Sequence, residues 1–130
     1  MQYRRVQRKG KYRSALEFNV AEHLKKLKIK FQYETKESKI HYIRPATNHT
    51  YLPDFILPNG IIVETKGFFD VSDRKKHLLI KEQYPMFDIR FIFSNSKSKL
   101  YKGAKGTYGD WCNKYGYTYA DKLVPKEWLK

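Results

Sequence analysis

One tight turn constrains the fold of this chain more than any other feature. The tripeptide Pro58-Asn59-Gly60 separates two short apolar stretches, residues 54–57 and 61–66, and this arrangement predicts a β-hairpin. Proline suits the first central position of a type I turn, asparagine the next, and glycine the left-handed position that closes a three-residue loop. We therefore expect a three-residue loop rather than the two-residue loop that Asn59 and Gly60 alone would form.

The loop length decides which face of the hairpin carries the first acidic side chain. A two-residue loop would pair Phe55 with Glu64 and turn Asp54 to the opposite face. A three-residue loop pairs Leu57 with Ile61 and sets Asp54 across from Glu64, with Cβ atoms roughly 4.5–5.5 Å apart. Two carboxylates that close repel each other unless a cation neutralises them. Oxygen ligands favour a hard divalent ion, so we expect Mg²⁺, with Mn²⁺ as a substitute.

The second strand of the hairpin also carries a cationic side chain. Alternation along a strand places Glu64 and Lys66 on one face. A divalent ion there could polarise a phosphodiester and activate water, and Lys66 could orient or deprotonate the water or stabilise the pentavalent phosphorus. A third carboxylate would help to build a two-metal site, and Glu17 is the candidate. The alternative is a solvated ion pair on an edge strand, which the apolar hairpin and the basic composition disfavour.

The charge balance indicates the kind of partner. Lysine and arginine total 27 against 13 aspartates and glutamates, a net charge of +14, so we expect an anionic partner, with nucleic acid as the leading candidate. A membrane is disfavoured, because the sequence has no 18-residue apolar stretch and no strongly amphipathic helix with bulky apolar residues on one side. The single cysteine, Cys112, excludes an internal disulfide, and no Cys/His cluster predicts zinc. No small-molecule cofactor is expected.

The chain is predicted to form one α/β domain, residues 14–130. Ser14 is the expected N-cap of the first helix, and Glu17 completes a capping-box pattern. Pro45 disfavours helix around it, so residues 45–50 are expected to form an extended connector or a wide turn. The expected helices are residues 14–28, 72–83 (with Leu78, Leu79 and Gln83 on or near its inner face), 107–115 and 121–129. The expected strands are residues 31–33, 39–43, 54–57, 61–66 and 88–94.

Basic side chains gather in three segments. Residues 1–13 hold no acid and predict a flexible basic arm, residues 74–76 lie near the start of the second helix, and residues 96–106 form a basic loop. Each could bind DNA phosphates. The alternative is a solubilising tail for residues 1–13 and a solvated face for residues 74–76. The candidate DNA-binding residues are Arg4, Arg5, Arg8, Lys9, Lys11, Arg13, Arg74, Lys75, Lys76, Lys97 and Lys99. The histidines show no metal or triad spacing and are expected to be structural or minor phosphate contacts: His23, His41, His49 and His77.

Longer strings around these residues resemble a known family. Pro53-Asp54 followed by Glu64-Thr65-Lys66 is similar to the PD-(D/E)xK signature of nucleases. The wider resemblance is to endonuclease I of T-odd bacteriophages, and it covers nearly the whole chain in register. It is carried by Arg13-Ser14-Ala15-Leu16-Glu17, Pro45-Ala46-Thr47-Asn48-His49-Thr50-Tyr51, Val63-Glu64-Thr65-Lys66-Gly67 and Asp73-Arg74-Lys75-Lys76-His77-Leu78-Leu79-Ile80.

This resemblance implies a structure-selective endodeoxyribonuclease that resolves four-way (Holliday) junctions and other branched DNA by metal-dependent hydrolysis, in the cytoplasm of an infected bacterium. The fold would be a restriction-endonuclease-like mixed β-sheet flanked by helices. The implied catalytic residues are Glu17, Asp54, Glu64 and Lys66. The implied metal ligands are Asp54, Glu64, the backbone carbonyl of Thr65, and Glu17.

The resemblance also implies an intertwined homodimer. Residues 14–44 and 51–130 would be joined by an extended bridge, residues 45–50, and exchanged between subunits, so that Glu17 of one chain completes the site of the other. Junction selectivity would arise from shape, because phosphate contacts carry little base information. Two other functions stay open, a non-catalytic basic DNA-binding module and a sequence-specific restriction-like nuclease.

Overall fold

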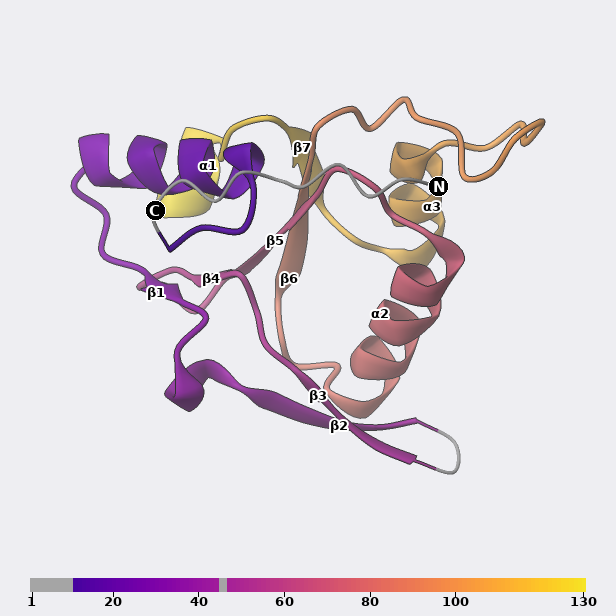
Figure 1. Cartoon of the computed structure of the whole chain (residues 1–130), viewed down its shortest axis with the longest axis horizontal. Coiled ribbons are helices and arrows are strands. Elements are labelled where there is room, and N and C mark those ends of the chain that lie inside the picture. Colours follow the sequence, from indigo (N-terminus) through magenta and orange to yellow (C-terminus); the bar gives the residue numbers. More distant parts are fainter. Residues whose placement is uncertain (1–10, 45–46) are drawn as a thin grey trace.

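The computed structural model of this chain describes residues 11–44 and 47–130 (Figure 1). Helices and strands are mixed along this part, which is therefore of the expected α/β class. None of its helices is long and apolar enough to cross a membrane. The helices are α1 (Ala15–Lys26), α2 (Val71–Gln83) and α3 (Tyr108–Tyr115), with 3-10 turns at Lys36–Ser38 and Lys126–Leu129. The strands are β1 (Gln32–Tyr33), β2 (Ile40–Arg44), β3 (Thr47–Tyr51), β4 (Phe55–Ile56), β5 (Ile62–Lys66), β6 (Ile89–Phe93) and β7 (Tyr119–Asp121).

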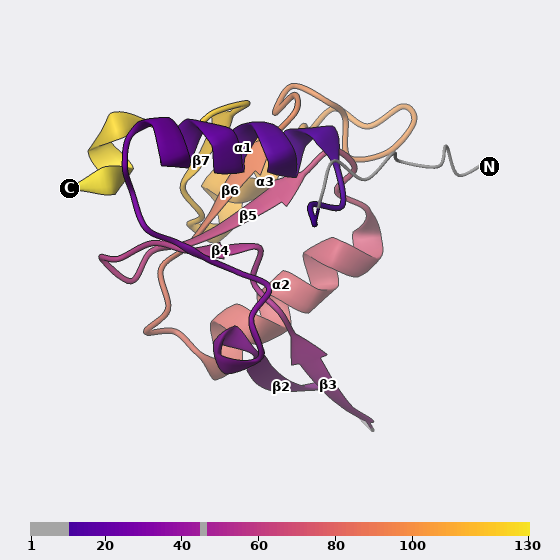
Figure 2. The same ribbon diagram turned by 60° about the vertical axis from the view of Figure 1, so that its left-hand side comes forward.

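Five of the described strands form one mixed sheet, in the order β1-β4-β5-β6-β7. The hairpin makes β4 antiparallel to β5, and the crossover through α2 makes β6 parallel to β5. Helix α1 covers one face of this sheet, whereas α2 and α3 cover the other (Figures 1 and 2). A mixed sheet flanked by helices was expected, and the finer restriction-endonuclease-like assignment stays a prediction.

The hydrophobic core has one part on each face of the sheet. Along β5, Ile62 packs with the α2 and α3 side, while Val63 packs with α1. The α2 side is rich in aromatic rings, among them Phe69 and Phe91, whose centroids lie 5.1 Å apart. Because β5 is central and buried on both faces, its acidic and basic residues are not a solvated pair on an edge strand.

The β4–β5 hairpin has the predicted three-residue loop. Gly60 N–H donates to the Leu57 carbonyl at 2.9 Å, and Leu57 N–H donates to the Ile61 carbonyl at 2.9 Å. Gly60 has φ +89°, a left-handed conformation that a side chain would strain. Ile56 lies opposite Ile62. The predicted register, which places Asp54 on the same face as the second acid, is thereby confirmed.

Two expectations about helices were wrong. Leu78 and Leu79 pack against the core as expected, but Gln83 is exposed. The buried residues of α2 are His77 and Ile80, because the helix turns its i, i+3 row toward the sheet. Residues 121–129 do not form a helix. They contain the end of β7 and a single 3-10 turn that begins after Pro125, a residue that lacks the N–H a continuous helix needs.

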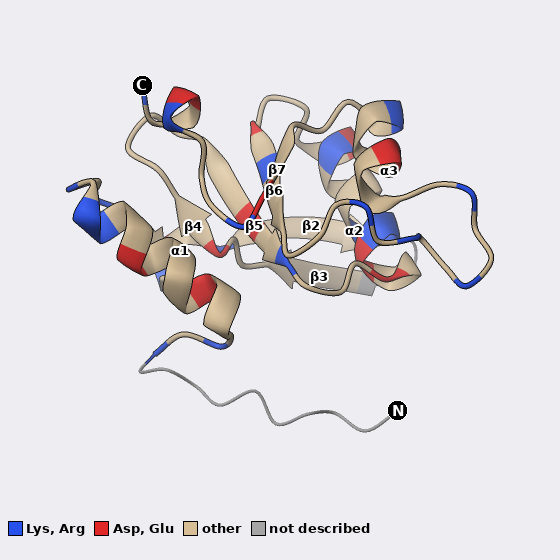
Figure 3. Cartoon of the chain, turned by 90° about the horizontal axis from the view of Figure 1, so that it is seen from above, with Lys and Arg blue, Asp and Glu red and all other residues tan. Residues whose placement is uncertain are grey.

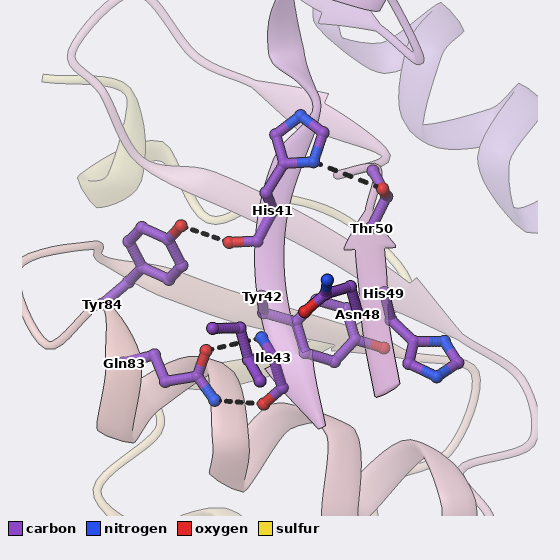
Figure 4. A pocket seen from close by; sticks show the side chains of 8 residues that line it. All are labelled: His41, Tyr42, Ile43, Asn48, His49, Thr50, Gln83 and Tyr84. Carbon is purple, nitrogen blue, oxygen red and sulfur yellow. Dashed lines mark hydrogen bonds between the residues drawn. The ribbon is translucent and has the colours of Figure 1, made fainter. Parts of the chain in front are cut away.

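A second hairpin, β2–β3, extends away from the sheet (Figures 1 and 2). Its tip, residues 45–46, lies outside the described residues. The end of α2 anchors it (Figure 4): Ile43 N–H donates to Gln83 Oε1 at 2.7 Å, and the Gln83 amide donates back to the Ile43 carbonyl. The Tyr84 hydroxyl donates to the His41 carbonyl. The backbone on both sides of the tip is extended, and its role as a bridge between subunits stays a prediction.

The packed part of the chain begins before the predicted domain boundary at Ser14. Tyr12 is buried, and its ring centroid lies 4.6 Å from that of Tyr33. Four candidate DNA contacts in the expected arm lie outside the described residues: Arg4, Arg5, Arg8 and Lys9.

Candidate active site

The β4–β5 hairpin, which lies between α1 and α2 (Figure 3), brings two acidic residues together. Asp54 N–H donates to Glu64 Oε1 at 3.1 Å. The Asp54 carboxylate in turn accepts from the Thr65 N–H at 2.9 Å and from the Thr65 hydroxyl at 2.8 Å. The acids are therefore tied to each other and to β5, with the Asp54 carboxylate held in one orientation.

Burial and mutual repulsion keep a proton on this acid pair. Burial, followed by the charge of Glu64, raises the pKa of Asp54 to about 8, although the Thr65 hydrogen bonds and the Lys66 charge lower it. Burial also raises the pKa of Glu64, against the charges of Lys66 and Lys76. Near neutral pH the pair therefore carries less than two negative charges. A divalent cation would displace the proton and neutralise both groups.

Lys66 is held as a cation beside the acid pair. Burial works against its charged form, but Glu64, Asp73 and Asp54 together raise the pKa of Lys66 above its usual value. Its Nζ lies 3.3 Å from Asp73 Oδ1 in the first turn of α2. A lysine kept protonated acts as a positive charge and hydrogen-bond donor. Of the roles predicted for Lys66, this favours stabilisation of negative charge over proton abstraction.

Helix α1 brings a third carboxylate to the hairpin. Ser14 caps α1 by accepting from the Glu17 N–H at 3.0 Å. The Tyr33 hydroxyl donates to Glu17 Oε1. Burial, followed by the charge of Asp54, raises the pKa of Glu17. The Glu17 carboxylate is thus an interior acid next to Asp54, a position that the capping pattern alone does not explain.

Glu34 is a fourth acid, and sequence reasoning missed it. Carboxylate oxygens of Glu17, Glu34 and Asp54 all lie within 4.8 Å of one another. Glu34 follows β1 with φ +46°, and its Oε1 lies 3.1 Å from Arg13 Nε. Its place depends on the pairing of β1 with β4, a contact between distant parts of the chain. No local pattern singles it out.

The donor set fits a hard divalent cation. The Asp54 carboxylate clusters with those of Glu17 and Glu34, and Glu64 is joined to the same residue through the Asp54 N–H. All of these groups offer carboxylate oxygens, the ligands that Mg²⁺ and Mn²⁺ prefer. Thr65 contributes its N–H and hydroxyl to Asp54, and the metal-binding role of its carbonyl stays a prediction.

Two buried polar side chains, His77 and Tyr51, lie next to Glu64. His77 Nε2 lies 3.8 Å from Glu64 Oε2, and its ring is fully buried. Burial, followed by the charges of Lys66 and Lys76, holds the pKa of His77 well below its usual range, so the ring is neutral. Within the described ranges, neither ring nitrogen has a hydrogen-bond partner, and the buried Tyr51 hydroxyl lies next to Glu64. Full burial excludes a phosphate contact for His77 and leaves the structural role that was also expected.

Some of the side chains predicted to contact DNA are engaged within the protein, whereas others are exposed. The Arg74 guanidinium donates to the Phe69 carbonyl at 2.7 Å and to the Leu100 carbonyl at 3.3 Å, so it holds two loops together. Arg13 is engaged in the ion pair described above, and Lys76 lies over the ring of Tyr51. The other described candidates are exposed, and their contacts with DNA stay predictions: Lys11, Lys75, Lys97 and Lys99.

Comparison with known proteins identifies relatives of this chain. The family model of phage endonuclease I matches residues 1–130. Endonuclease I of Escherichia phage T7 is 55% identical over 125 residues, which cover 96% of this chain and 83% of that protein. Endodeoxyribonuclease 1 of Enterobacteria phage T3 is 54% identical over 119 residues, which cover 92% of this chain and 77% of that protein. A match of this extent shows that the chain belongs to the phage endonuclease I family.

Proposed function

We propose that this protein is a Mg²⁺-dependent endodeoxyribonuclease that resolves four-way junctions and other branched DNA. The names of the phage T7 and T3 relatives support cleavage of DNA. The observation that carries the proposal is the pair of the half-buried Asp54 and the buried Glu64, joined by a 3.1 Å hydrogen bond from the Asp54 N–H, with Lys66 alongside. Burying two acids costs folding free energy, and a catalytic metal site accounts for that cost.

The proposed mechanism assigns metal binding to the carboxylates and charge stabilisation to Lys66. Asp54, Glu64 and the Thr65 carbonyl would hold the ion, and Glu17 would join them from α1. When bound, Mg²⁺ or Mn²⁺ supplies polarisation of the scissile phosphate and activation of the attacking water. The hydrogen bonds from Thr65 keep Asp54 in place. Lys66, as an ammonium, stabilises the negative charge that develops on the phosphate oxygens.

Selection of branched DNA would follow from a dimer with two such sites. In the single chain described above, Glu17 lies beside Asp54 of the same chain. Exchange at residues 45–50 would form the same contacts between two chains, with residues 14–44 of each on residues 51–130 of the other, and Glu17 would then serve the partner's site. The protruding β2–β3 hairpin supports this exchange, because it connects these two parts of the chain (Figure 2). Two sites at a fixed separation match the paired strands of a junction, so shape selects the substrate. The protein would act in the cytoplasm of an infected bacterium.

The sharing of sites is tested by mixing two inactive variants, Glu17→Gln and Asp54→Asn, in one refolded heterodimer. If sites are shared across chains, one site receives both variant residues and the other receives both native carboxylates. Nicking of a four-way junction then returns, whereas each variant refolded alone stays inactive. If each site uses one chain only, both sites of the heterodimer carry a variant residue. Nicking that stays absent would therefore refute exchange.

A panel of substrates separates the competing functions. The protein should cut four-way and three-way junctions with Mg²⁺ and leave a linear duplex intact. Cutting of linear duplex at a fixed sequence would indicate a restriction-like nuclease. Binding of junctions with no metal-dependent nicking would indicate a DNA-binding module. The Asp54→Asn variant should bind the junction with unchanged affinity and fail to nick it, and nicking at the parental rate would disprove the metal assignment.

A further inference from the structure

A groove of about 640 Å³ lies beside the candidate active site, outside the residues assigned to catalysis. One wall comes from the connection between β5 and α2, and the other comes from the loop between β6 and α3. We call it the aromatic groove. It is lined by Phe68, Asp70, Val71, Lys99, Leu100, Tyr101, Lys102 and Gly103.

The aromatic groove exposes apolar side chains in a strongly basic protein. Phe68 is 61% exposed, Tyr101 is 67% exposed and Val71 is 56% exposed. In the described part of the chain, no aromatic ring stacks on either Phe68 or Tyr101. Contiguous apolar surface of this kind is typical of binding sites.

The groove is built in advance by hydrogen bonds. Arg74 joins the two walls, because its guanidinium donates to the Phe69 carbonyl on one side and the Leu100 carbonyl on the other. The second wall is closed on itself by the bond from Leu100 N–H to the Gly106 carbonyl at 3.1 Å. A ligand therefore meets formed walls, which reduces the entropy cost of binding.

The groove lies where the catalytic strand ends. Lys66 is the last residue of β5, and Phe68 follows two residues later, so their Cα atoms are at most about 7 Å apart. The other wall follows β6, which is parallel to β5 (Figure 1). The carboxyl ends of neighbouring parallel strands are the usual ligand-binding edge of an α/β sheet. A substrate held at Lys66 would reach the aromatic groove.

Charge and shape together identify the occupant. Lys99 and Lys102 line the groove, and neither has a carboxylate within 4 Å among the described residues. The acid of the groove, Asp70, is occupied as the N-cap of α2, where it accepts from the Asp73 N–H at 2.8 Å. An anionic chain with flat apolar rings fits such a surface. Exposed aromatic rings beside lysines bind nucleic-acid strands by base stacking.

We propose that the aromatic groove binds an unstacked nucleobase of the DNA strand held at the active site, by stacking on Tyr101 and Phe68. The proposal rests on the proposed function in taking DNA as the substrate. A continuous duplex hides the faces of its bases, whereas a branch point can expose one. The groove would therefore add selectivity for branched DNA close to the scissile phosphate.

The test uses the full-length protein with Asp54→Asn, so that DNA stays uncut. Tyr101→Leu and Phe68→Leu keep an apolar side chain and remove the ring face. Phe87→Leu is the matched control, since Phe87 is an exposed aromatic that stacks on Tyr84 at the far end of α2. Binding is measured to a four-way junction with 2-aminopurine at the branch point and to a duplex with the same base inside. Each groove variant should bind the junction about tenfold more weakly and lose quenching of the 2-aminopurine fluorescence, with duplex binding and the control unchanged.

Three results would overturn the proposal. Equal weakening on junction and duplex would indicate an ordinary backbone contact, and unchanged quenching would exclude stacking. If a groove variant self-associates less than the parent but binds DNA equally well, the groove is a contact between protein chains instead. Cleavage of the same junction by the parent protein with Mg²⁺ is measured separately. Quenching without cleavage would refute the nuclease proposal and keep the groove, while cleavage without quenching would refute the groove alone.

Discussion

Replacing Asp54 by asparagine should stabilise the metal-free protein while it abolishes metal-dependent cleavage. The pKa of Asp54 rises from an ordinary 3.8 to about 8 on folding. The folded state therefore holds this proton more tightly than the unfolded state. The contribution of this group to the free energy of unfolding is fully present below pH 3.8 and is lost as the pH rises toward 8. Above pH 8 it no longer changes with pH. The loss is about 1.4 kcal/mol per pH unit, hence on the order of 4 kcal/mol at pH 7.

The Asp54→Asn variant avoids this loss, because the amide cannot ionise and its oxygen can still accept from Thr65. For a domain of this size, 4 kcal/mol corresponds to roughly 15 °C in melting temperature. Thermal unfolding in EDTA from pH 5 to pH 9 should show an advantage of the variant that grows with pH. Asp88→Asn, at an exposed acid paired with Arg90, should show no such trend.

Added metal should stabilise the parent protein rather than the variant in the same assay. Mg²⁺ binds the folded parent protein and should raise its melting temperature, with little effect on the Asp54→Asn variant. The reasoning fails if the difference between variant and parent is the same at every pH, or if the variant is the less stable protein at pH 8. Either result would mean that the Asp54 carboxylate is solvated in the folded state.

Three further predictions concern the surroundings of the site. Asp73→Asn removes the charged partner of the Lys66 ammonium and should lower kcat about tenfold, a loss of transition-state stabilisation near 1.4 kcal/mol. The affinity for the junction should not change. An unchanged kcat would show that Lys66 needs no positioning by Asp73. Tyr33→Phe removes the hydrogen-bond donor to the buried Glu17 carboxylate and should lower the free energy of unfolding by about 1–3 kcal/mol in urea titrations. An unchanged free energy of unfolding would show that water replaces the hydroxyl. Gly60→Ala should cost about 1–2 kcal/mol through its left-handed backbone alone, since no atom lies within 4 Å of the added Cβ; a larger loss measured by calorimetry would reveal a steric clash instead.

The central pair of acids could be predicted from the sequence because its geometry is local. A turn of three residues sets the register of the strands that it joins, and the register sets which side chains face each other. Pro58-Asn59-Gly60 therefore places Asp54 with Glu64 without reference to the rest of the chain. Alternation along the same strand adds Lys66. The cap of α1 at Ser14 was predictable for the same reason.

The surroundings of that pair depend on contacts between distant parts of the chain. Glu34 reaches Asp54 only because β1 pairs with β4, and Arg74 holds two loops instead of facing solvent because the β6–α3 loop folds against it. Asp73 reaches Lys66 and His77 reaches Glu64 because α2 covers this face of the sheet.

The sequence by itself thus determined the acid pair, its neighbouring lysine and the strongly basic charge of the chain, all of which follow from short-range periodicity and composition. Only the tertiary structure decided which further side chains surround the pair, how far burial raises the pKa of Asp54, and that two loops form the aromatic groove. Burial and long-range pairing are properties of the packed chain, and no local pattern encodes them.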